Sequence, residues 1–136
     1  VYMGAIANGG KAAVPQIIQK TVSALGIPSL PSVTHKTGTL ISSETAEKLA
    51  GLMAENVEKT YGTKRFPNMD LCAKSGTAEV GENMPPHATF AGYLADEEYP
   101  LAFVVCVEDA GYGKTVCIPI VSQVLAVCKD VIDKTA

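Results

Sequence analysis

The sequence is poor in charge, and its charge is not gathered into a basic surface. Asp, Glu, Lys and Arg make up 18% of the 136 residues, the net charge is −3, and the lysines are dispersed. A nucleic-acid interface needs a concentrated basic patch, so we expect no nucleic-acid partner. The sequence also lacks a long uncharged apolar segment, and its N-terminus lacks a basic stretch followed by an apolar core. From these absences we expect no membrane span and identify no signal peptide.

Metal-binding spacing is missing as well. The two histidines and four cysteines do not form the closely spaced groups that hold zinc, and no two cysteines make a C-x-x-C pair. We therefore expect no metal and no cofactor. Each cysteine stands among apolar residues, which predicts buried thiols that act as small apolar side chains. The four are Cys72, Cys106, Cys117 and Cys128.

The composition that remains is typical of a folded chain. A hydrophobic fraction of 47% over 136 residues suits one domain at most, with a moderate core. In the N-terminal part we expect the end of a helix at residues 2–8, stopped by Gly9 and Gly10. A short strand is expected at residues 15–22, followed by a loop at residues 26–31 that is rich in turn formers.

Two further helices are expected. The first is capped by Ser43 and closed by Lys59 and Gly62. Its apolar stripe, which we interpret as core packing, is Ala46, Leu49, Ala50, Met53 and Val57. The final amphipathic helix starts near Pro119, since proline is tolerated in a first turn. Its apolar side is predicted to be Cys117, Ile120, Val121, Val124, Cys128, Val131 and Ile132.

Three strands are predicted between these helices. A strand-like run at 69–73 leads into the sequence Lys-Ser-Gly-Thr at 74–77, and two more strands cover 87–94 and 101–108. The short links predict an antiparallel meander. The run 101–107 is continuously apolar, which predicts a central strand covered on both faces. The predicted fold class is therefore α+β, with antiparallel strands packed against helices.

Two Lys-hydroxyl-Gly-Thr sequences compete as the functional motif. They are Lys36-Thr37-Gly38-Thr39 and Lys74-Ser75-Gly76-Thr77. The first stands between a proline-rich loop and a helix cap, where turn chemistry accounts for it. The second leaves a strand whose partner follows after one loop, so it can present side chains and backbone N–H groups along a cleft. We therefore take residues 74–77 as the functional copy, called the tetrad below, and expect it to suit a carboxylated acyl substrate.

Other polar residues are assigned structural roles. His35 and His87 lack the Asp and Ser partners of a catalytic arrangement, which favours structural or solvated histidines. Residues 95–98 are interpreted as a solvated acidic turn. Residues 111–114 contain glycines but lack the strand–loop–helix pattern of a phosphate loop, so we predict a linker there.

The ordered series of short segments resembles the C-terminal part of a penicillin-binding protein transpeptidase domain. The segments are 5–10 (AIANGG), 41–49 (ISSETAEKL), 74–79 (KSGTAE) and 90–93 (FAGY). The resemblance covers nearly the whole chain, and its specificity comes from the order of the segments. It implies a partial β-lactamase/transpeptidase-like fold, in which residues 1–136 form the C-terminal part of one domain.

The resemblance also implies roles for the tetrad. Lys74 would bring positive charge to the substrate carboxylate and to proton transfer at the nucleophile. Ser75, at a position where threonine is commoner, and Thr77 would offer hydroxyls to that carboxylate. Gly76 would let the acyl group approach the backbone closely. The backbone N–H of Thr77 would be one donor of an oxyanion hole.

The nucleophile that such a site serves is missing from the chain. In this family a serine stands three residues before a lysine, and no serine here has a lysine at that distance. No Ser-x-Asn sequence occurs either. We therefore expect no catalysis by this polypeptide alone, and interpret it as a fragment of a longer D,D-transpeptidase.

The resemblance implies a parent enzyme that cross-links peptidoglycan on the extracytoplasmic face of the bacterial cell membrane, anchored by a segment outside this chain. Its partners would be D-Ala-D-Ala stem peptides, β-lactams that acylate the same serine, and the remainder of its own domain. Two alternatives stay open. A β-lactamase or β-lactam sensor shares the tetrad and the fold, and a non-catalytic interaction module would keep the sheet without a nucleophile.

The strand at 101–107 raises one further expectation. Without the strands that would lie beside it in the parent, its long edge is exposed and can pair with another chain. We expect dimers or larger self-associated species, unless residues 15–22 cover this edge.

Overall fold

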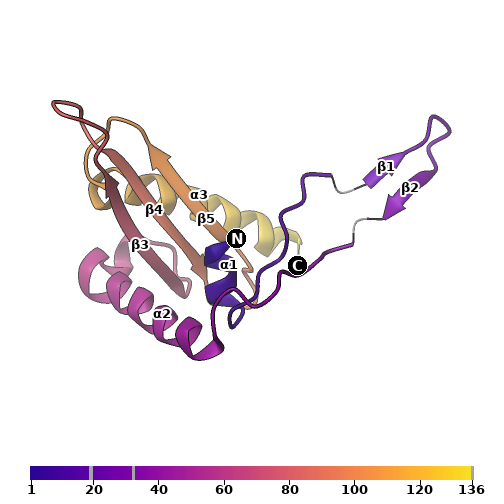
Figure 1. Cartoon of the computed structure of the whole chain (residues 1–136), viewed down its shortest axis with the longest axis horizontal. Helices are drawn as coiled ribbons and strands as arrows, with labels where there is room; N and C mark the ends of the chain where they lie inside the picture. The colour runs from indigo at the N-terminus through magenta and orange to yellow at the C-terminus, as the bar shows by residue number, and fades with distance from the viewer. Residues whose placement is uncertain (19, 32, 136) are drawn as a thin grey trace.

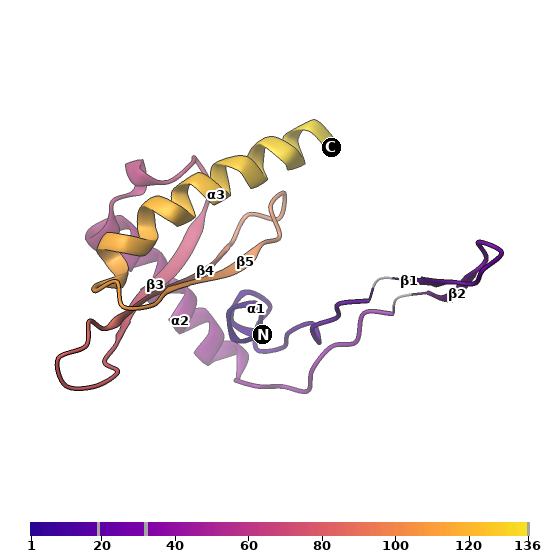
Figure 2. The ribbon, with the colours of Figure 1, turned by 90° about the horizontal axis from the view of Figure 1, so that it is seen from above.

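The computed structural model describes residues 1–18, 20–31 and 33–135, arranged as layers of helix and sheet with a projecting arm (Figure 1). In chain order the elements are α1 (Tyr2–Ala7), β1 (Lys20–Val22), β2 (Pro28–Pro31), α2 (Ser43–Asn56), the π-helical turn η1 (Val57–Tyr61), the 3-10 turn η2 (Thr63–Arg65), β3 (Leu71–Ala78), β4 (His87–Leu94), β5 (Ala102–Val107) and α3 (Gly113–Thr135). The sheet of β3, β4 and β5 lies between α3 on one side and α2 with α1 on the other (Figure 2). The predicted α+β class is confirmed.

The sheet has the strand order β3-β4-β5 with both pairs antiparallel, so the predicted meander is also confirmed. Short links suffice because an antiparallel neighbour can be reached by a turn, whereas a parallel neighbour needs a long crossover. β4 has the predicted bounds. β3 continues through residues 74–77, so the tetrad lies within a strand instead of following one.

β5 is an edge strand, and the prediction of a central strand covered on both faces is wrong. β4 holds the central place. Alternate residues of β5 are exposed: Val104 keeps 72% of its surface accessible, whereas Phe103 and Val105 pack against the core under α3. A continuously apolar run carries no alternation, so it cannot show whether one face or both faces of a strand are buried.

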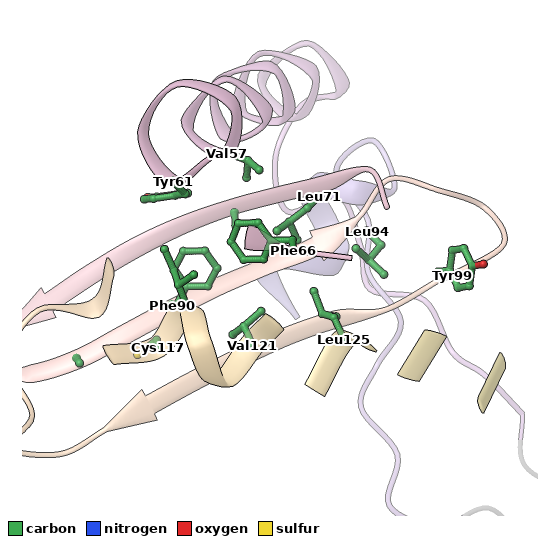
Figure 3. Packing of buried hydrophobic residues seen from close by; sticks show 13 residues of the cluster. Val57, Tyr61, Phe66, Leu71, Phe90, Leu94, Tyr99, Cys117, Val121 and Leu125 are labelled. Atoms are coloured by element: carbon green, nitrogen blue, oxygen red, sulfur yellow. The ribbon is translucent and has the colours of Figure 1, made fainter. Parts of the chain in front are cut away.

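Two apolar cores lie on opposite faces of the sheet. The larger core joins the sheet to α3, whose contribution is Cys117, Ile118, Val121 and Leu125 (Figure 3). Phe66 and Phe103 each stack on the fully buried Phe90, with ring centroids 6.2 Å apart. The smaller core joins the sheet to α2 and consists of Met53, Cys72 and Tyr93. Because both faces are covered, the position of β3 is fixed from two sides.

The N-cap of α2 lies one residue before the predicted cap. Ser42, not Ser43, is the N-cap, and its hydroxyl accepts a hydrogen bond from the Thr45 N–H at 3.1 Å. Both serines precede the same apolar pattern, so the sequence does not distinguish them. The chain continues beyond Asn56 as the wider turn η1, which ends at Tyr61 and is followed by Gly62 with a φ of 85°. The buried members of the predicted stripe are Ala46, Met53 and Val57.

α3 begins at Gly113, well before the predicted start near Pro119. The buried residues that pack on the sheet are Cys117, Ile118, Val121 and Leu125. The predicted apolar side was therefore partly wrong. Ile120, Val124 and Val131 are exposed. The helix has aliphatic residues on every side, and periodicity alone therefore locates its buried face poorly. The linker predicted at 111–114 is shorter than expected, because its last two residues belong to α3.

α3 is also long and apolar enough to cross a membrane, which contradicts the expectation that no such segment exists. The 23-residue helix has no charged residue between Lys114 and Lys129. One side of it is packed on the sheet, and a core helix of this kind meets the same criteria of length and composition. The property by itself assigns no membrane role.

The arm is a hairpin of β1 and β2 that projects away from the sheet (Figures 1 and 2). The predicted strand at 15–22 is reduced to Lys20–Val22, Ile17 is fully exposed, and Gln19 lies outside the described residues. The predicted loop at 26–31 contains β2, whose prolines are tolerated because each strand of a two-stranded hairpin is an edge. Within the described part of the chain, this hairpin pairs only with itself and leaves the β5 edge uncovered.

All four cysteines are free thiols. Cys72 and Cys117 are buried, as predicted, and Cys128 is partly buried. Cys106 is exposed on β5, so the prediction of a buried thiol is wrong there. Burial raises the pKa of the Cys117 thiol, which keeps it protonated and unreactive.

The C-terminal half of α3 is fastened to the β4–β5 turn by three polar groups. The Tyr99 hydroxyl donates to Asp133 Oδ1 at 2.6 Å and accepts from Lys129 Nζ. Lys129 also pairs with Asp133 at 3.1 Å, and its ammonium lies 4.4 Å from the Tyr99 ring centroid. The hydrogen bond from Tyr99 lowers the pKa of the Asp133 carboxyl. The residue directly after the acidic turn at 95–98 therefore anchors the helix.

We predict that the exposed edge of β5 makes the isolated 136-residue chain self-associate. Val104→Lys places a charge on this edge strand, and charged edge residues oppose pairing between chains. The substitution should shift the sedimentation-velocity distribution toward monomer. Val127→Lys is the matched control on the outer side of α3, at a position 63% exposed, and should leave the distribution unchanged. A wild-type chain that sediments as a monomer would contradict the prediction.

Candidate functional site

The backbone of the tetrad alternates between the paired edge and the free edge of β3. In an antiparallel pair, successive residues direct their N–H and C=O groups alternately toward the partner strand and away from it. The Ala95 N–H donates to the backbone oxygen of Asp70 at 2.7 Å, so the backbone groups of Asp70 are directed toward the chain of β4. Counting by twos along the register, Gly76 is also directed toward β4. Ser75 and Thr77 therefore direct their backbone groups toward the free edge.

Both backbone groups of Ser75 confirm this alternation by binding partners at the free edge. Its N–H donates to the Tyr61 hydroxyl at 2.8 Å, and its C=O accepts from Lys74 Nζ at 2.6 Å. The Tyr61 hydroxyl in turn donates to the Ser75 hydroxyl at 3.1 Å. Thr77 has the same backbone orientation as Ser75, so its N–H faces the same edge, one repeat further along.

Two glycines permit close packing directly behind the tetrad. A Cβ on Gly76 would overlap the hydroxyl of Thr89 on the neighbouring strand. A Cβ on Gly113 would overlap the backbone oxygens of both Thr89 and Gly76. The first residue of α3 therefore rests on two strands at the level of the tetrad, an approach that only glycine permits. This contact fixes the strand from the side opposite α2.

The groups at the free edge can bind an anion. An ammonium attracts negative charge, and hydroxyl and N–H groups donate hydrogen bonds to it. Lys74 is exposed, and within the described residues it takes part in no ion pair, so its charge is available to a ligand. The edge thus combines one cation, the hydroxyl of Ser75 and the outward N–H of Thr77, and Thr77 itself is exposed.

The tetrad is open to solvent in part: Lys74 and Thr77 are exposed, whereas Ser75 and Gly76 are partly buried. A cavity of about 810 Å³ lies between α1, the start of α2 and the adjoining ends of β4 and β5. A second cavity of about 520 Å³ lies beside η1 and the start of β3. Neither is lined by residues 74–77. A ligand held at the free edge would need a second wall from other residues.

The other copy of the motif, at 36–39, has a structural use. Lys36 forms an isolated bridge with Ala13. The Thr37 hydroxyl accepts from the Ala12 N–H at 3.0 Å, and the Thr37 N–H donates to the Ala12 oxygen at 2.8 Å. These contacts join the two ends of the arm where it meets the sheet layers. The copy closes the base of the arm.

His87 is structural, as predicted. Its Nδ1 accepts a hydrogen bond from the Asp109 N–H at 3.0 Å, which ties the start of β4 to the segment after β5. His35 lies in the arm outside any named strand. Among residues 1–18, 20–31 and 33–135, no group of three or more His, Cys, Asp or Glu side chains could hold a metal ion.

Sequence reasoning missed two residues of the site, Tyr61 and Gly113. Tyr61 ends η1 and is buried, and its spacing of four from Val57 was a usable signal of a shared face. Its hydrogen bond to a residue fourteen positions later could not be read from a pattern. Gly113 was predicted to lie in a linker and not in a packed contact, because a glycine between polar residues is typical of a linker.

Comparisons with known proteins identify what the chain resembles. The family model described as the penicillin binding protein transpeptidase domain matches residues 1–126. The peptidoglycan D,D-transpeptidase PbpA of Mycolicibacterium smegmatis is 29% identical over 113 residues, and that of Mycobacterium tuberculosis is 32% identical over 113 residues. The alignments cover 78% and 76% of this chain and 22% of each relative, so the chain spans about a fifth of their length.

Solved structures share the fold. Penicillin-binding protein A from M. tuberculosis, as a ceftriaxone acyl-enzyme complex, superposes with a TM-score of 0.78 at 26% identity, covering 91% of this chain and 30% of that one. The D,D-transpeptidase domain of a peptidoglycan glycosyltransferase from Eggerthella lenta superposes with a TM-score of 0.75 at 24% identity, covering 90% and 29%. The second likeness supports the fold alone. The predicted transpeptidase-like fold is confirmed.

We predict that Gly113→Ala destabilises the chain because its methyl group would meet two backbone oxygens that cannot rotate away. Overpacking of this kind costs about 2 kcal/mol of unfolding free energy. Gly51→Ala in α2 is the matched control, since no atom lies within 4 Å of its Cβ position. That substitution should stabilise the chain by about 1 kcal/mol through helix propensity. Urea denaturation followed by circular dichroism measures both, and equal effects of the two substitutions would refute the close contact.

Proposed function

The chain belongs to the penicillin-binding protein transpeptidase family, and from that premise we propose that it forms the substrate-binding wall of a peptidoglycan D,D-transpeptidase site. One observation carries the proposal: the free edge of β3 presents the Lys74 ammonium, the Ser75 hydroxyl and the outward N–H of Thr77. An acyl donor of this enzyme ends in a carboxylate, which needs a cation and a hydroxyl to bind it. It reacts at a carbonyl, whose oxygen needs an N–H donor.

Each group at the edge has a role in this proposal. The terminal carboxylate of the stem peptide pairs with Lys74 and accepts hydrogen bonds from the hydroxyls of Ser75 and Thr77. The Thr77 N–H donates to the carbonyl oxygen as negative charge develops on it, and a preorganised donor of this kind is worth about 3 kcal/mol in the transition state. Gly76 keeps the strand open to close approach by the acyl group.

The serine nucleophile comes from residues outside these 136. No serine of the chain stands three residues before a lysine, and the chain spans about a fifth of its relatives. In the whole enzyme the serine oxygen would bond to the penultimate D-Ala carbonyl carbon, and the terminal D-Ala would leave with the serine proton. An amine of a second stem peptide would then bond to the acyl carbon, the ester bond to serine would break, and a proton of the amine would pass to the serine oxygen. The 136-residue chain alone would not be acylated.

The remainder of the same domain is proposed as the first partner of this chain. Two features of this chain would be covered by that remainder: the β5 edge and the cavity of about 810 Å³ beside α1. β-lactams are proposed as further ligands, because the similar M. tuberculosis protein is known as a ceftriaxone acyl-enzyme complex. We place the enzyme on the extracytoplasmic face of the cell membrane, where peptidoglycan is assembled, with its anchor outside this chain.

We predict that a fluorescent penicillin labels a version of the protein extended upstream through its nucleophile, and not the 136-residue chain. Lys74→Ala in the extended protein should reduce the labelling rate at least tenfold, since it removes the charge that pairs with the penicillin carboxylate. Lys36→Ala is the matched control, because that lysine sits in the other copy of the motif at the base of the arm. Intact mass spectrometry measures the labelled fraction with time.

Each result bears on a different part of the proposal. Labelling of the 136-residue chain itself would reveal a nucleophile within it. Equal loss from Lys36→Ala and Lys74→Ala would overturn the choice of residues 74–77. If neither length of the protein reacts, a non-catalytic interaction module becomes the better description. Hydrolysis of the penicillin with rapid turnover would instead indicate a β-lactamase.

A further inference from the structure

Tyr61 touches the tetrad but has no role in the function proposed above. Tyr61 as a whole residue is 4% exposed, and its ring meets Phe90 edge to face, with ring centroids 5.2 Å apart and planes at 71°. Figure 3 shows the ring beside Phe90, on the turn that follows α2. A phenylalanine would fill this place equally well. The hydroxyl is therefore the part of Tyr61 that packing does not explain.

The chain reaches this place by an unusual turn. η1 has the wide winding of a π-helix, closed by a hydrogen bond from the Gly62 N–H to the Val57 oxygen at 2.8 Å. Gly62 follows with a φ of 85°, which favours glycine. π-helical turns occur frequently at functional sites. α2 packs on one face of the sheet, whereas Val57 and Tyr61 belong to the larger core on the other face. The turn η1 therefore takes the chain from one face to the other across the free edge of β3.

The hydroxyl of Tyr61 makes two hydrogen bonds, and both go to Ser75. It accepts from the Ser75 N–H at 2.8 Å and donates to the Ser75 Oγ at 3.1 Å. A serine hydroxyl has one proton to donate and two lone pairs that accept. Because Tyr61 supplies a proton to one lone pair, the Ser75 proton is left to point elsewhere. The free edge of β3 is the side on which an incoming anion would receive it.

We propose that Tyr61 is a positioning residue that holds the Ser75 hydroxyl as a hydrogen-bond donor toward the carboxylate of the acyl donor. The inference rests on the proposed function, because it assigns the carboxylate to the free edge of β3. Tyr61 itself touches neither the carboxylate nor the reacting carbonyl. By occupying the Ser75 N–H, it also leaves the Thr77 N–H as the next outward donor along the strand.

The test compares two acylating agents on the extended protein: benzylpenicillin, which has a free carboxylate, and its methyl ester, which has none. Tyr61→Phe keeps the ring and removes only the hydroxyl. We expect it to lower the second-order acylation rate constant for the free acid about tenfold, the usual range for a hydrogen bond to a charged group. The rate constant for the ester should stay within about twofold of that of the unaltered protein.

A double-mutant cycle with Ser75→Ala separates positioning of the hydroxyl from support of the backbone. Ser75→Ala keeps the N–H bond to Tyr61 and removes the Oγ, so it should also slow the acid and spare the ester. Adding Tyr61→Phe to Ser75→Ala should then cause no further loss. A further tenfold loss in the double variant would overturn the proposal, because it would show that Tyr61 acts through the backbone N–H.

Tyr99→Phe is the matched control for loss of a hydroxyl from a buried tyrosine. The Tyr99 hydroxyl bonds to Asp133 and Lys129 at the other end of the sheet, away from the tetrad. Its acylation rate constants should equal those of the unaltered protein with both agents. If Tyr61→Phe slows the acid and the ester equally, the role of Tyr61 is structural and the proposal is wrong. If Tyr61→Phe fails to fold, Ser75→Ala still tests the proposal. An equal loss of rate with the acid and the ester in Ser75→Ala would refute a role of the Ser75 hydroxyl toward the carboxylate.

Failure of this inference can be distinguished from failure of the proposed function. If the unaltered extended protein is not acylated, or if Lys74→Ala leaves acylation unchanged, the proposed function itself is wrong. If acylation depends on Lys74 while Tyr61→Phe reacts normally with both agents, only the role of Tyr61 is wrong.

Discussion

The pairing register between β3 and β4 is the constraint on which the site depends. It decides that Ser75 and Thr77, rather than Gly76, turn their backbone groups to the free edge. A shift by one residue would reverse this choice and would also bring every side chain of β3 to the opposite face. Two cores on opposite faces and the contact of Gly113 with both strands hold the register in place. The chemistry at the edge is thus a consequence of packing that lies behind it.

The antiparallel meander of β3, β4 and β5 could be predicted from the sequence because its signals are local. The bounds of β4 follow from turn residues on either side, and the prediction that favours residues 74–77 over 36–39 rests on the strand-like run at 69–73, part of which the structure includes in β3. Each of these inferences uses neighbours within a few residues. Signals between residues a few positions apart can be read directly from the sequence.

The remaining features depend on contacts between distant residues, and the sequence does not record them. β5 is apolar throughout, yet only its place at the edge exposes Val104. α3 is apolar on most sides, so its buried face is decided by the shape of the sheet under it. The bond between Tyr61 and Ser75 joins a helical turn to a strand, and no periodicity connects the two. Gly113 was predicted to lie in a linker because its contacts with Gly76 and Thr89 are far away in the sequence and leave no local signal.

The position of α1 bears on the order in which the molecule assembles. α1 is the first element of the chain but contacts β4 and β5, whereas β3, β4, β5 and α3 follow one another with short links. Contacts between near neighbours form fast, while contacts that close a long loop must overcome its entropy first. We expect the C-terminal half to condense as a unit and α1 to dock onto it afterwards. α1 would then precede the sheet in the chain but be among the last of these elements to reach its native place.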